Sequence, residues 1–298
     1  MLLGKDGEVV AVLGLDRLRF ECSDRELTLG ATSNFYTLEA GAGGYLFMYW
    51  LRKYGGGLVF GASADMERIL LKQNWTRIRA KGYYLNPPYE VWPNDAWWRV
   101  LAKGVLRYAH RTQVSRQLAR IPPDSIAKIS VSEEHDFVGD WLPRRSPFGF
   151  RFAPPLDYLR WRYKPGLSFV HYRLFRVVAR GCTMGYVVIN DSEKQIMVAQ
   201  CDAEDPQTLA YGVLLSILEV TRYDRKPRTV FLISTHHEMQ KIYEQIGFRG
   251  VEMGGRLWVG SLGGPLDLPA DTSNWLLNYD WGDNGMVAPF PDQLPAQV

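Results

Sequence analysis

The stretch Thr229–Phe248, TVFLISTHHEMQKIYEQIGF, combines a strand pattern with an amphipathic helix pattern and decides the fold class. It opens on four consecutive apolar residues, 230–233, which is the length of one buried strand. Thr235, followed three residues later by Glu238, matches a capping box and predicts that a helix begins there. The stretch therefore predicts a strand that leads directly into a helix.

The helix pattern places an apolar face on the sheet and a tyrosine near its end. Met239, Ile242 and Ile246 recur at helical spacing. Gly247 is expected to end the helix, because glycine favours the left-handed conformation found at helix C-termini. Tyr243 lies on the penultimate turn of this helix, which makes it the residue of most functional interest.

The same pattern occurs earlier in the chain, in Leu58–Trp75, LVFGASADMERILLKQNW. The two stretches align without a gap, and the matched pairs are Val59-Phe60 with Leu232-Ile233, Met66 with Met239, Ile69 with Ile242, and Trp75 with Phe248. Tyr243 has Leu70 as its counterpart. The repeat predicts an internal duplication on the scale of a domain rather than a short solenoid period.

The composition is that of an ordinary folded chain of 298 residues, with 46% hydrophobic, 22% charged and 13% aromatic residues. This length suggests two domains or one large one. The net charge of +3 is small and the basic residues are scattered, which argues against a nucleic-acid partner. No apolar run is long enough to span a bilayer, and Cys22, Cys182 and Cys201 show no metal or disulfide spacing. We therefore expect a cytoplasmic protein with no metal site and no membrane partner.

A glycine cluster separates an expected strand from an expected helix in the first half. Glu26–Leu38 reads as extended chain and Tyr45–Lys53 as a helix, with Ala40-Gly41-Ala42-Gly43-Gly44 between them. Such a turn is a ready anion site, because free backbone N–H groups and the helix dipole both point at the loop. A tight turn without a ligand is equally compatible with these glycines.

The rest of the chain predicts a connector and a second unit of the same order. The expected elements are helices at 95–110 and 111–120, a strand at 126–131, helices at 133–141 and 156–163, strands at 169–178, 183–190 and 195–200, a helix at 206–220 capped by Asp205, and a strand pair within 249–262. A strand pair is also expected at 76–85. The chain then divides into an N-terminal module at 1–88 that is trimmed at its start, a helical connector at 89–123, and a C-terminal module with tail at 124–298.

The order of elements and the local motifs resemble the GNAT N-acyltransferase family, here as a tandem of two modules. His236–Phe248, HHEMQKIYEQIGF, is similar to the family's late signature, which leads to a Tyr and then to Gly-Phe. The resemblance implies an α/β (α+β) fold of two GNAT-like modules, each with a mixed, mostly antiparallel sheet flanked by helices. It also implies acetyl-CoA or another acyl-CoA as co-substrate, and Tyr243 as the acid that protonates the departing thiolate.

The same resemblance assigns donor binding to the first module, since the family binds the pyrophosphate of acyl-CoA in a glycine-rich loop after a strand. The implied cofactor-binding residues are Tyr36, Thr37 and Leu38, whose backbone edge faces the pantetheine, and Gly41, Gly43 and Gly44 in the phosphate loop. Glu39 follows this strand and is a candidate base for the acceptor amine, against the alternative of a solvated loop carboxylate.

The two halves divide the family's motifs between them. The first loop keeps the glycines but has Ala40 and Tyr45 where the family usually has Arg or Gln and a small residue. The equivalent loop of the second half, Cys201–Pro206, has no glycine and three acids, which repel a pyrophosphate. The first half also lacks the strand and paired helices that normally open the module.

Three functions stay open at this point. The first is an N-acyltransferase that moves an acyl group from acyl-CoA to the amine of a small molecule or peptide. The second is a catalytically degenerate protein of the same fold that binds a ligand or partner. The third is an aminoacyl-tRNA-dependent transferase, to which the small net charge gives little support. His171, His236 and the pair Arg144-Arg145 are further polar candidates, for which a structural or solvated role is the default, and the sequence does not indicate an oligomeric state.

Overall fold

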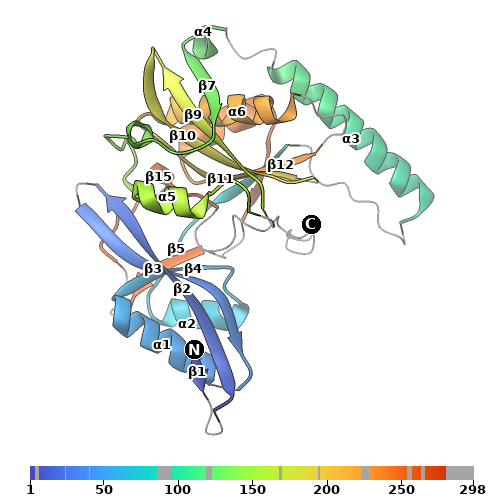
Figure 1. The fold of residues 1–298 in the computed structure, drawn as a ribbon. Helices are drawn as coiled ribbons and strands as arrows, with labels where there is room; N and C mark the ends of the chain where they lie inside the picture. The colour runs from blue at the N-terminus through green and yellow to red at the C-terminus, as the bar shows by residue number, and fades with distance from the viewer. Residues whose placement is uncertain are drawn as a thin grey trace.

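The computed structural model describes residues 1–3, 7–23, 25–39, 41–85, 95–118, 123–167, 170–193, 195–222, 228–253, 257–262 and 266–279, apart from the side chains of 33–35, 107, 110–118 and 124–125. Figure 1 shows two bodies, one containing the N-terminus with α1 and α2, the other containing α6, with α3 along its outside. Each body is built on one sheet. Among the described helices, none is both long and apolar enough to cross a membrane.

The first sheet has the strand order β15-β8-β2-β3-β4-β14-β5, with β1 paired to β2. Its longest element is the antiparallel pair β2 (Val9–Cys22) and β3 (Arg25–Thr37), which reverses next to Ser23 at a positive φ of 53°. Helices α1 (Ala42–Tyr54) and α2 (Ala64–Lys72) pack on this sheet. The other strands are β1 (Leu2–Leu3), β4 (Gly56–Phe60), β5 (Thr76–Arg77), β8 (Phe150–Phe152), β14 (Leu257–Ser261) and β15 (Trp275–Leu276).

The second sheet has the order β13-β6-β12-β11-β10-β9-β7. Its strands are β6 (Lys81–Leu85), β7 (Ile129–Glu134), β9 (Tyr172–Ala179), β10 (Cys182–Asp191), β11 (Gln195–Ala203), β12 (Thr229–Ser234) and β13 (Arg249–Glu252). Helices α6 (Pro206–Thr221) and α7 (His237–Ile246) share one hydrophobic cluster with the sheet, and α5 (Leu156–Arg162) with the 3₁₀ turn η1 (Gly139–Trp141) shares another. The two mostly antiparallel sheets flanked by helices confirm the expected fold class.

The two halves exchange their last strands. β6, which follows the first strand–helix repeat, lies between β12 and β13 in the second sheet. β14, which follows the second repeat, lies between β4 and β5 in the first sheet. The strand pairs expected at 76–85 and within 249–262 are therefore not hairpins, which corrects the sequence interpretation. The division of the chain at 88 and 124 stays a prediction, and each sheet contains a strand from the other half.

The edge of the first sheet is also completed by the second half. β8 pairs antiparallel with β2, with Phe152 opposite Phe20, and β15 pairs parallel with β8. One hydrophobic cluster then joins the two sheets, where Phe20 stacks on Phe150 at 4.9 Å and Phe231 of β12 meets Tyr279 edge-on at 4.9 Å. Because this core is shared, we expect the halves to fold as one unit.

The stretch Thr229–Phe248 folds as a strand and a helix, as predicted, with one correction. α7 ends at Gly247, which has a φ of 99°, and its apolar residues are buried. The residue that caps the helix is His236, without a side-chain bond, rather than Thr235. The buried Thr235 hydroxyl instead donates to the Trp275 carbonyl oxygen at 2.7 Å, because the C-terminal tail packs against the end of β12.

Two other local expectations are corrected. α3 (Trp97–Leu118) is one helix where two were expected, because no glycine or proline interrupts the helical pattern near residue 110. The helix expected at 133–141 is replaced by the end of β7 and by η1. The capping predicted for Asp205 is confirmed, since its carboxylate accepts from the Thr208 N–H at 2.6 Å. The short helix α4 (Pro123–Ile126) follows the connector.

Candidate functional site

The first half contains a parallel strand pair that separates after two residues. β3 and β4 are in register only where Gly30 lies opposite Gly57 and Ala31 opposite Leu58. Beyond this point, residues 32–37 of β3 keep β2 as their partner, but no described strand pairs with them on the side facing β4. An open backbone edge of this kind can pair with an extended ligand.

Trp50 holds α1 against the point where these strands separate. Its indole is fully buried and lies directly over both glycines of the registered pair. A Cβ atom built on Gly30 or Gly57 comes within 2.3 Å or 2.1 Å of this ring, so only glycine leaves room for it. The N-terminus of α1 is thereby fixed relative to the open edge of β3.

The N-terminus of α1 is unoccupied by acidic or capping side chains. Gly41 precedes the helix with a φ of 85° and makes no side-chain cap, and the first turn contains no acid. The Ala42 N–H donates to the Glu39 carbonyl oxygen at 3.3 Å, and the Tyr45 N–H donates to the Gly41 carbonyl oxygen at 3.1 Å. Free N–H groups at the positive end of a helix suit an anionic group.

In the second half, the parallel strands β11 and β12 also separate, but the helix α6 that follows β11 begins differently from α1. β11 and β12 are in register over three residues, 195–197 against 229–231, and then separate. α6 is capped by the Asp205 carboxylate, and Pro206 at its first turn has no N–H to offer. Glu204 accepts from the Arg144 backbone N–H at 2.8 Å. The place where an anion could bind is therefore taken by the chain's own carboxylates.

The C-terminal tail, residues 275–279, fills the divergence between β11 and β12. The Asn278 side chain pairs with both backbone groups of Cys201: Oδ1 accepts from the N–H at 2.9 Å, and Nδ2 donates to the carbonyl oxygen at 3.1 Å. Asn278 is 2% exposed. With Thr235 bound to Trp275 on the other strand, the tail bridges the two strand ends. The edge that is open in the first half is occupied in the second.

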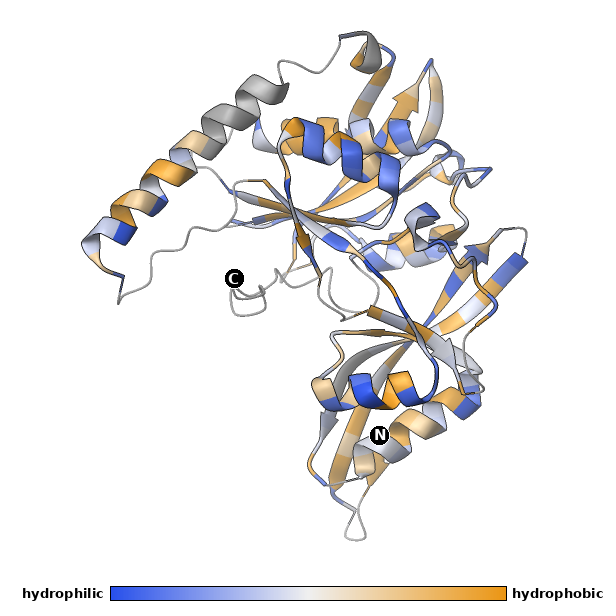
Figure 2. Ribbon diagram, turned by 180° about the vertical axis from the view of Figure 1, so that it is seen from behind, coloured by the Kyte–Doolittle hydropathy of each residue, from blue (hydrophilic) through white to orange (hydrophobic). Residues whose placement is uncertain are grey.

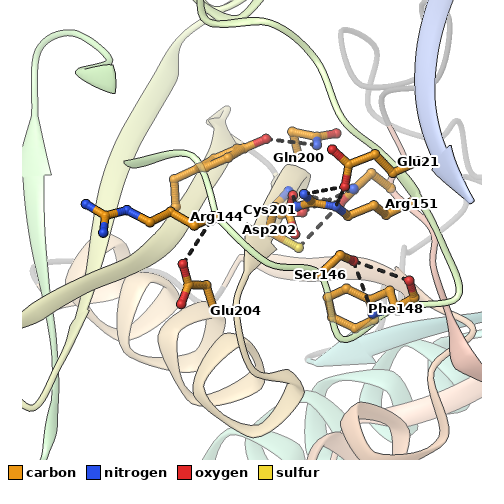
Figure 3. A network of polar contacts seen from close by, with 11 residues as sticks. Glu21, Arg144, Ser146, Phe148, Arg151, Gln200, Cys201, Asp202 and Glu204 are labelled. Carbon is orange, nitrogen blue, oxygen red and sulfur yellow. Dashed lines mark hydrogen bonds and ion pairs between the residues drawn. The ribbon is translucent and has the colours of Figure 1, made fainter. Parts of the chain in front are cut away.

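A buried polar cluster lies beside this tail and joins the two halves (Figure 3). Arg151 of β8 donates to Glu21 of β2, with Nη2 2.6 Å from Oε2, and forms an ion pair with Asp202 of β11. Arg151 and Asp202 are 4% and 2% exposed. Burial raises the pKa of Asp202 to about 7, and the Arg151 charge opposes this shift. The sequence carries no signal for this cluster, because its members lie on three separate strands.

Known structures of low sequence identity share this architecture. A GCN5-related N-acetyltransferase from Anabaena variabilis ATCC 29413 matches with a TM-score of 0.51 at 8% identity, over 87% of this chain and 61% of that one. A conserved protein from Enterococcus faecalis V583 matches with a TM-score of 0.51 at 6% identity, over 86% of this chain and 60% of that one. The chain has the GNAT fold. It spans about three fifths of the length of these two structures, and the likeness shows the fold alone. No protein-family model and no curated protein matches the sequence.

The structure places Tyr243 of the GNAT late signature in the hydrophobic core. Its side chain is 1% exposed, with ring centroids 5.7 Å from both Tyr83 and Phe248, and burial raises its pKa well above the ordinary value. Its counterpart in the first half, Leu70, is fully buried as well. The matched position thus belongs to the core in both halves. A role for Tyr243 as the acid stays a prediction.

The other predicted site residues gather at the end of β3. Tyr36 and Leu38 are 60% and 66% exposed, and the Leu38 N–H donates to the Val10 carbonyl oxygen at 2.8 Å. The Thr37 hydroxyl donates to the Glu39 carbonyl oxygen at 2.8 Å, which holds the start of the loop. Glu39 is exposed beside the N-terminus of α1, at the end of the site where phosphates rather than an acceptor amine are expected.

The histidine candidates lie away from this edge. His236 is buried beside Phe148, with ring centroids 5.2 Å apart, and burial lowers its pKa. His171 is exposed, with Nδ1 3.9 Å from the Asp191 carboxylate. Within the described residues, no group of three or more His, Cys, Asp or Glu side chains could hold a metal ion.

Proposed function

We propose that this protein is an N-acyltransferase that takes its acyl group from acyl-CoA and binds this donor in its first half. The observation that carries the proposal is the open edge of β3 next to the uncapped, glycine-rich start of α1. The pantetheine amides pair with the backbone of residues 32–37, and the pyrophosphate lies on the Gly43 and Gly44 N–H groups. The first turn of α1 contains no acid, so the positive end of the helix dipole can stabilise the phosphates.

Acyl-CoA supplies the thioester that an acceptor amine attacks. The chain's own contribution is to hold the donor extended along β3, so that attack takes place within a bound complex. In well-oriented reactions, such positioning lowers the activation free energy by about 7–11 kcal/mol. A thiol has an ordinary pKa of about 8.5, so a thiolate can leave without an obligatory acid, and general acid catalysis adds about 10²–10⁴-fold. The identity of the acyl group and of the acceptor amine stays open in this proposal.

A second candidate function is that of a binding protein of the same fold without acyl transfer. Two observations favour it: the tail occupies the β11–β12 divergence, and Tyr243 is packed as a core residue. On this alternative, the first half binds CoA or a related anion and transfers nothing. The two candidates share the donor site and differ only in turnover.

The donor site can be tested with a substitution at Gly44. A side chain fits there, since a Cβ atom built on Gly44 meets no atom within 4 Å. We expect Gly44→Asp to weaken CoA binding at least about tenfold, because its carboxylate repels the pyrophosphate while remaining favourable for the helix. The matched control is Gly44→Asn, which has the same shape without the charge and should keep affinity within a few-fold of the native protein.

The measurement is the rise in melting temperature with CoA, acetyl-CoA and a long-chain acyl-CoA, followed by calorimetric titration. A ligand at about 100 times its dissociation constant stabilises by about 2.7 kcal/mol, a shift that is readily measured. If none of the three ligands shifts the native protein, the donor site is wrong. If they shift it and no amine acceptor in a panel is acylated, the binding-protein alternative replaces the transferase.

Tyr243→Phe tests whether the acid of the family signature takes part. We expect the transfer rate to stay within about twofold, because Tyr243 belongs to the second sheet, where Asn278 already holds the backbone of Cys201. The melting temperature should change little, since phenylalanine keeps the packing. A fall in turnover of about 10²-fold or more with unchanged donor affinity would instead assign the acid to Tyr243.

A further inference from the structure

Helix α3 exposes an apolar face along its described length. Five large side chains, here called the α3 stripe, lie within about 100° of the helix circumference at 100° per residue. They are Trp97, Trp98, Leu101, Val105 and Tyr108, with 75%, 54%, 60%, 67% and 71% of each exposed. Figure 2 shows apolar residues along this helix, which lies at the outside of the molecule. Exposed apolar side chains grouped in this way mark an interaction surface.

The side of α3 that faces the protein carries both apolar and basic residues. Val100 and Lys103 are half-buried, and Lys103 pairs with Asp95 at 2.5 Å. Arg99 is exposed, its guanidinium 5.2 Å from the ring centroid of Trp98. The sequence of the helix, Trp97–Leu118, contains five Lys or Arg residues and no Asp or Glu. The helix therefore joins a strongly basic sequence to an apolar face that points away from the body.

The positive charge of the α3 sequence indicates which kind of partner could cover the α3 stripe. A second copy of α3 brings the same five positive charges, and like charges alongside one another disfavour the pairing. A nucleic acid would complement the positive charge of α3, but it would leave the tryptophans and aliphatic side chains of the stripe in water. A surface of anionic lipid satisfies both, since the stripe enters the acyl boundary while basic side chains meet the head groups.

We propose that α3 is an interfacial helix through which the protein binds an anionic lipid surface. Trp97, Trp98 and Tyr108 suit the boundary between acyl chains and head groups, because their rings are amphipathic. The helix lies in the plane of the surface, with the protein body on the side of Val100 and Lys103. The expectation of no membrane partner considered only segments that span a bilayer, and a helix lying in the surface needs none.

The test is co-sedimentation of the full chain with vesicles of phosphatidylcholine alone and of phosphatidylcholine mixed with phosphatidylglycerol. The stripe variant is Leu101→Ser/Val105→Ser. The matched control is Ile69→Ser/Leu71→Ser on α2, two aliphatic residues that are 40% and 60% exposed. We expect binding to the mixed vesicles that weakens at high salt, and a loss of at least about tenfold in partitioning for the stripe variant only.

Several results overturn the proposal. One is the absence of binding to the mixed vesicles, and another is equal binding by the stripe variant and the native protein. A third is a concentration-dependent dimer in ultracentrifugation that the stripe variant abolishes while the vesicles stay unbound, because this assigns the face to a second copy. Circular dichroism melts of both variants check that the exposed substitutions leave the fold intact.

Discussion

A chain that ends at Asn274 is expected to lose its cooperative unfolding transition. Five of the residues it lacks are buried in the joint between the halves: Trp275, Leu276, Leu277, Asn278 and Tyr279, with 1%, 2%, 1%, 2% and 7% exposed. Removing one large buried side chain costs about 2–5 kcal/mol, and a whole domain is stable by only about 5–15 kcal/mol. Losing four such side chains together therefore exceeds the stability that a chain of this size commonly has.

The matched control is a chain that ends at Tyr279, which keeps every described contact of the tail. The two truncated chains are compared by calorimetric melts and by the dispersion of their amide NMR signals. Equal melting temperatures would show that the tail does not hold the sheets together. An intermediate variant, Asn278→Leu, keeps the bulk and leaves the Cys201 backbone groups without partners, which should cost about 1–3 kcal/mol for each group.

The sequence predicts the strand–helix repeat because local spacing determines it. Val230–Ile233 and the helical spacing of Met239, Ile242 and Ile246 are each visible within a few residues. The prediction that Thr235 caps the helix was wrong. Its hydroxyl donates to the carbonyl oxygen of Trp275, which is forty residues away in the sequence. Contacts of that range leave no local pattern.

The strand exchange could not be predicted for a related reason. β6 and β14 each follow a strand–helix unit, and each contains a short apolar run, Tyr83–Leu85 and Leu257–Val259. Either strand could complete its own sheet or the other one with the same apolar face. The choice depends on the shared core around Phe231 and Tyr279, which exists only in the folded chain.

The candidate site was partly visible in the sequence. The glycine cluster and the helix after it indicated the uncapped start of α1, and the acids of Cys201–Pro206 indicated that the second loop differs. The tail's place in the second divergence was not visible, because an asparagine near a loose terminus reads as a loop residue. Tyr243 and its aligned counterpart Leu70 are both buried, at 1% and 0% exposed.

Arg151→Met is expected to destabilise the protein by about 3–5 kcal/mol at about pH 8. It leaves the Asp202 carboxylate buried without its cation, and removing one partner of a buried ion pair commonly costs this much. The matched control is Arg19→Met. Arg19 pairs with Glu26 at 2.9 Å with both side chains about half exposed, so its loss should cost at most about 1 kcal/mol.

The double variant Arg151→Met/Asp202→Asn separates charge from packing. Removing the stranded carboxylate should recover most of the lost stability, since Glu21 is one-third exposed and keeps its hydration. Chemical denaturation of the native, single and double variants gives the coupling between Arg151 and Asp202. Additive effects of the two substitutions would show that the pair does not join the halves energetically.

The pH dependence gives an independent check on Asp202. Its pKa is about 7 in the folded protein against an ordinary 3.8, so between these values the folded state holds a proton that the unfolded chain has lost. The contribution of Asp202 to stability therefore falls as the pH rises from about 4 to about 7. Asp202→Asn cannot titrate, so its stability should decline less than that of the native protein across this window. Parallel curves would mean that Asp202 is already ionised at the lower end, with Arg151 outweighing the cost of burial.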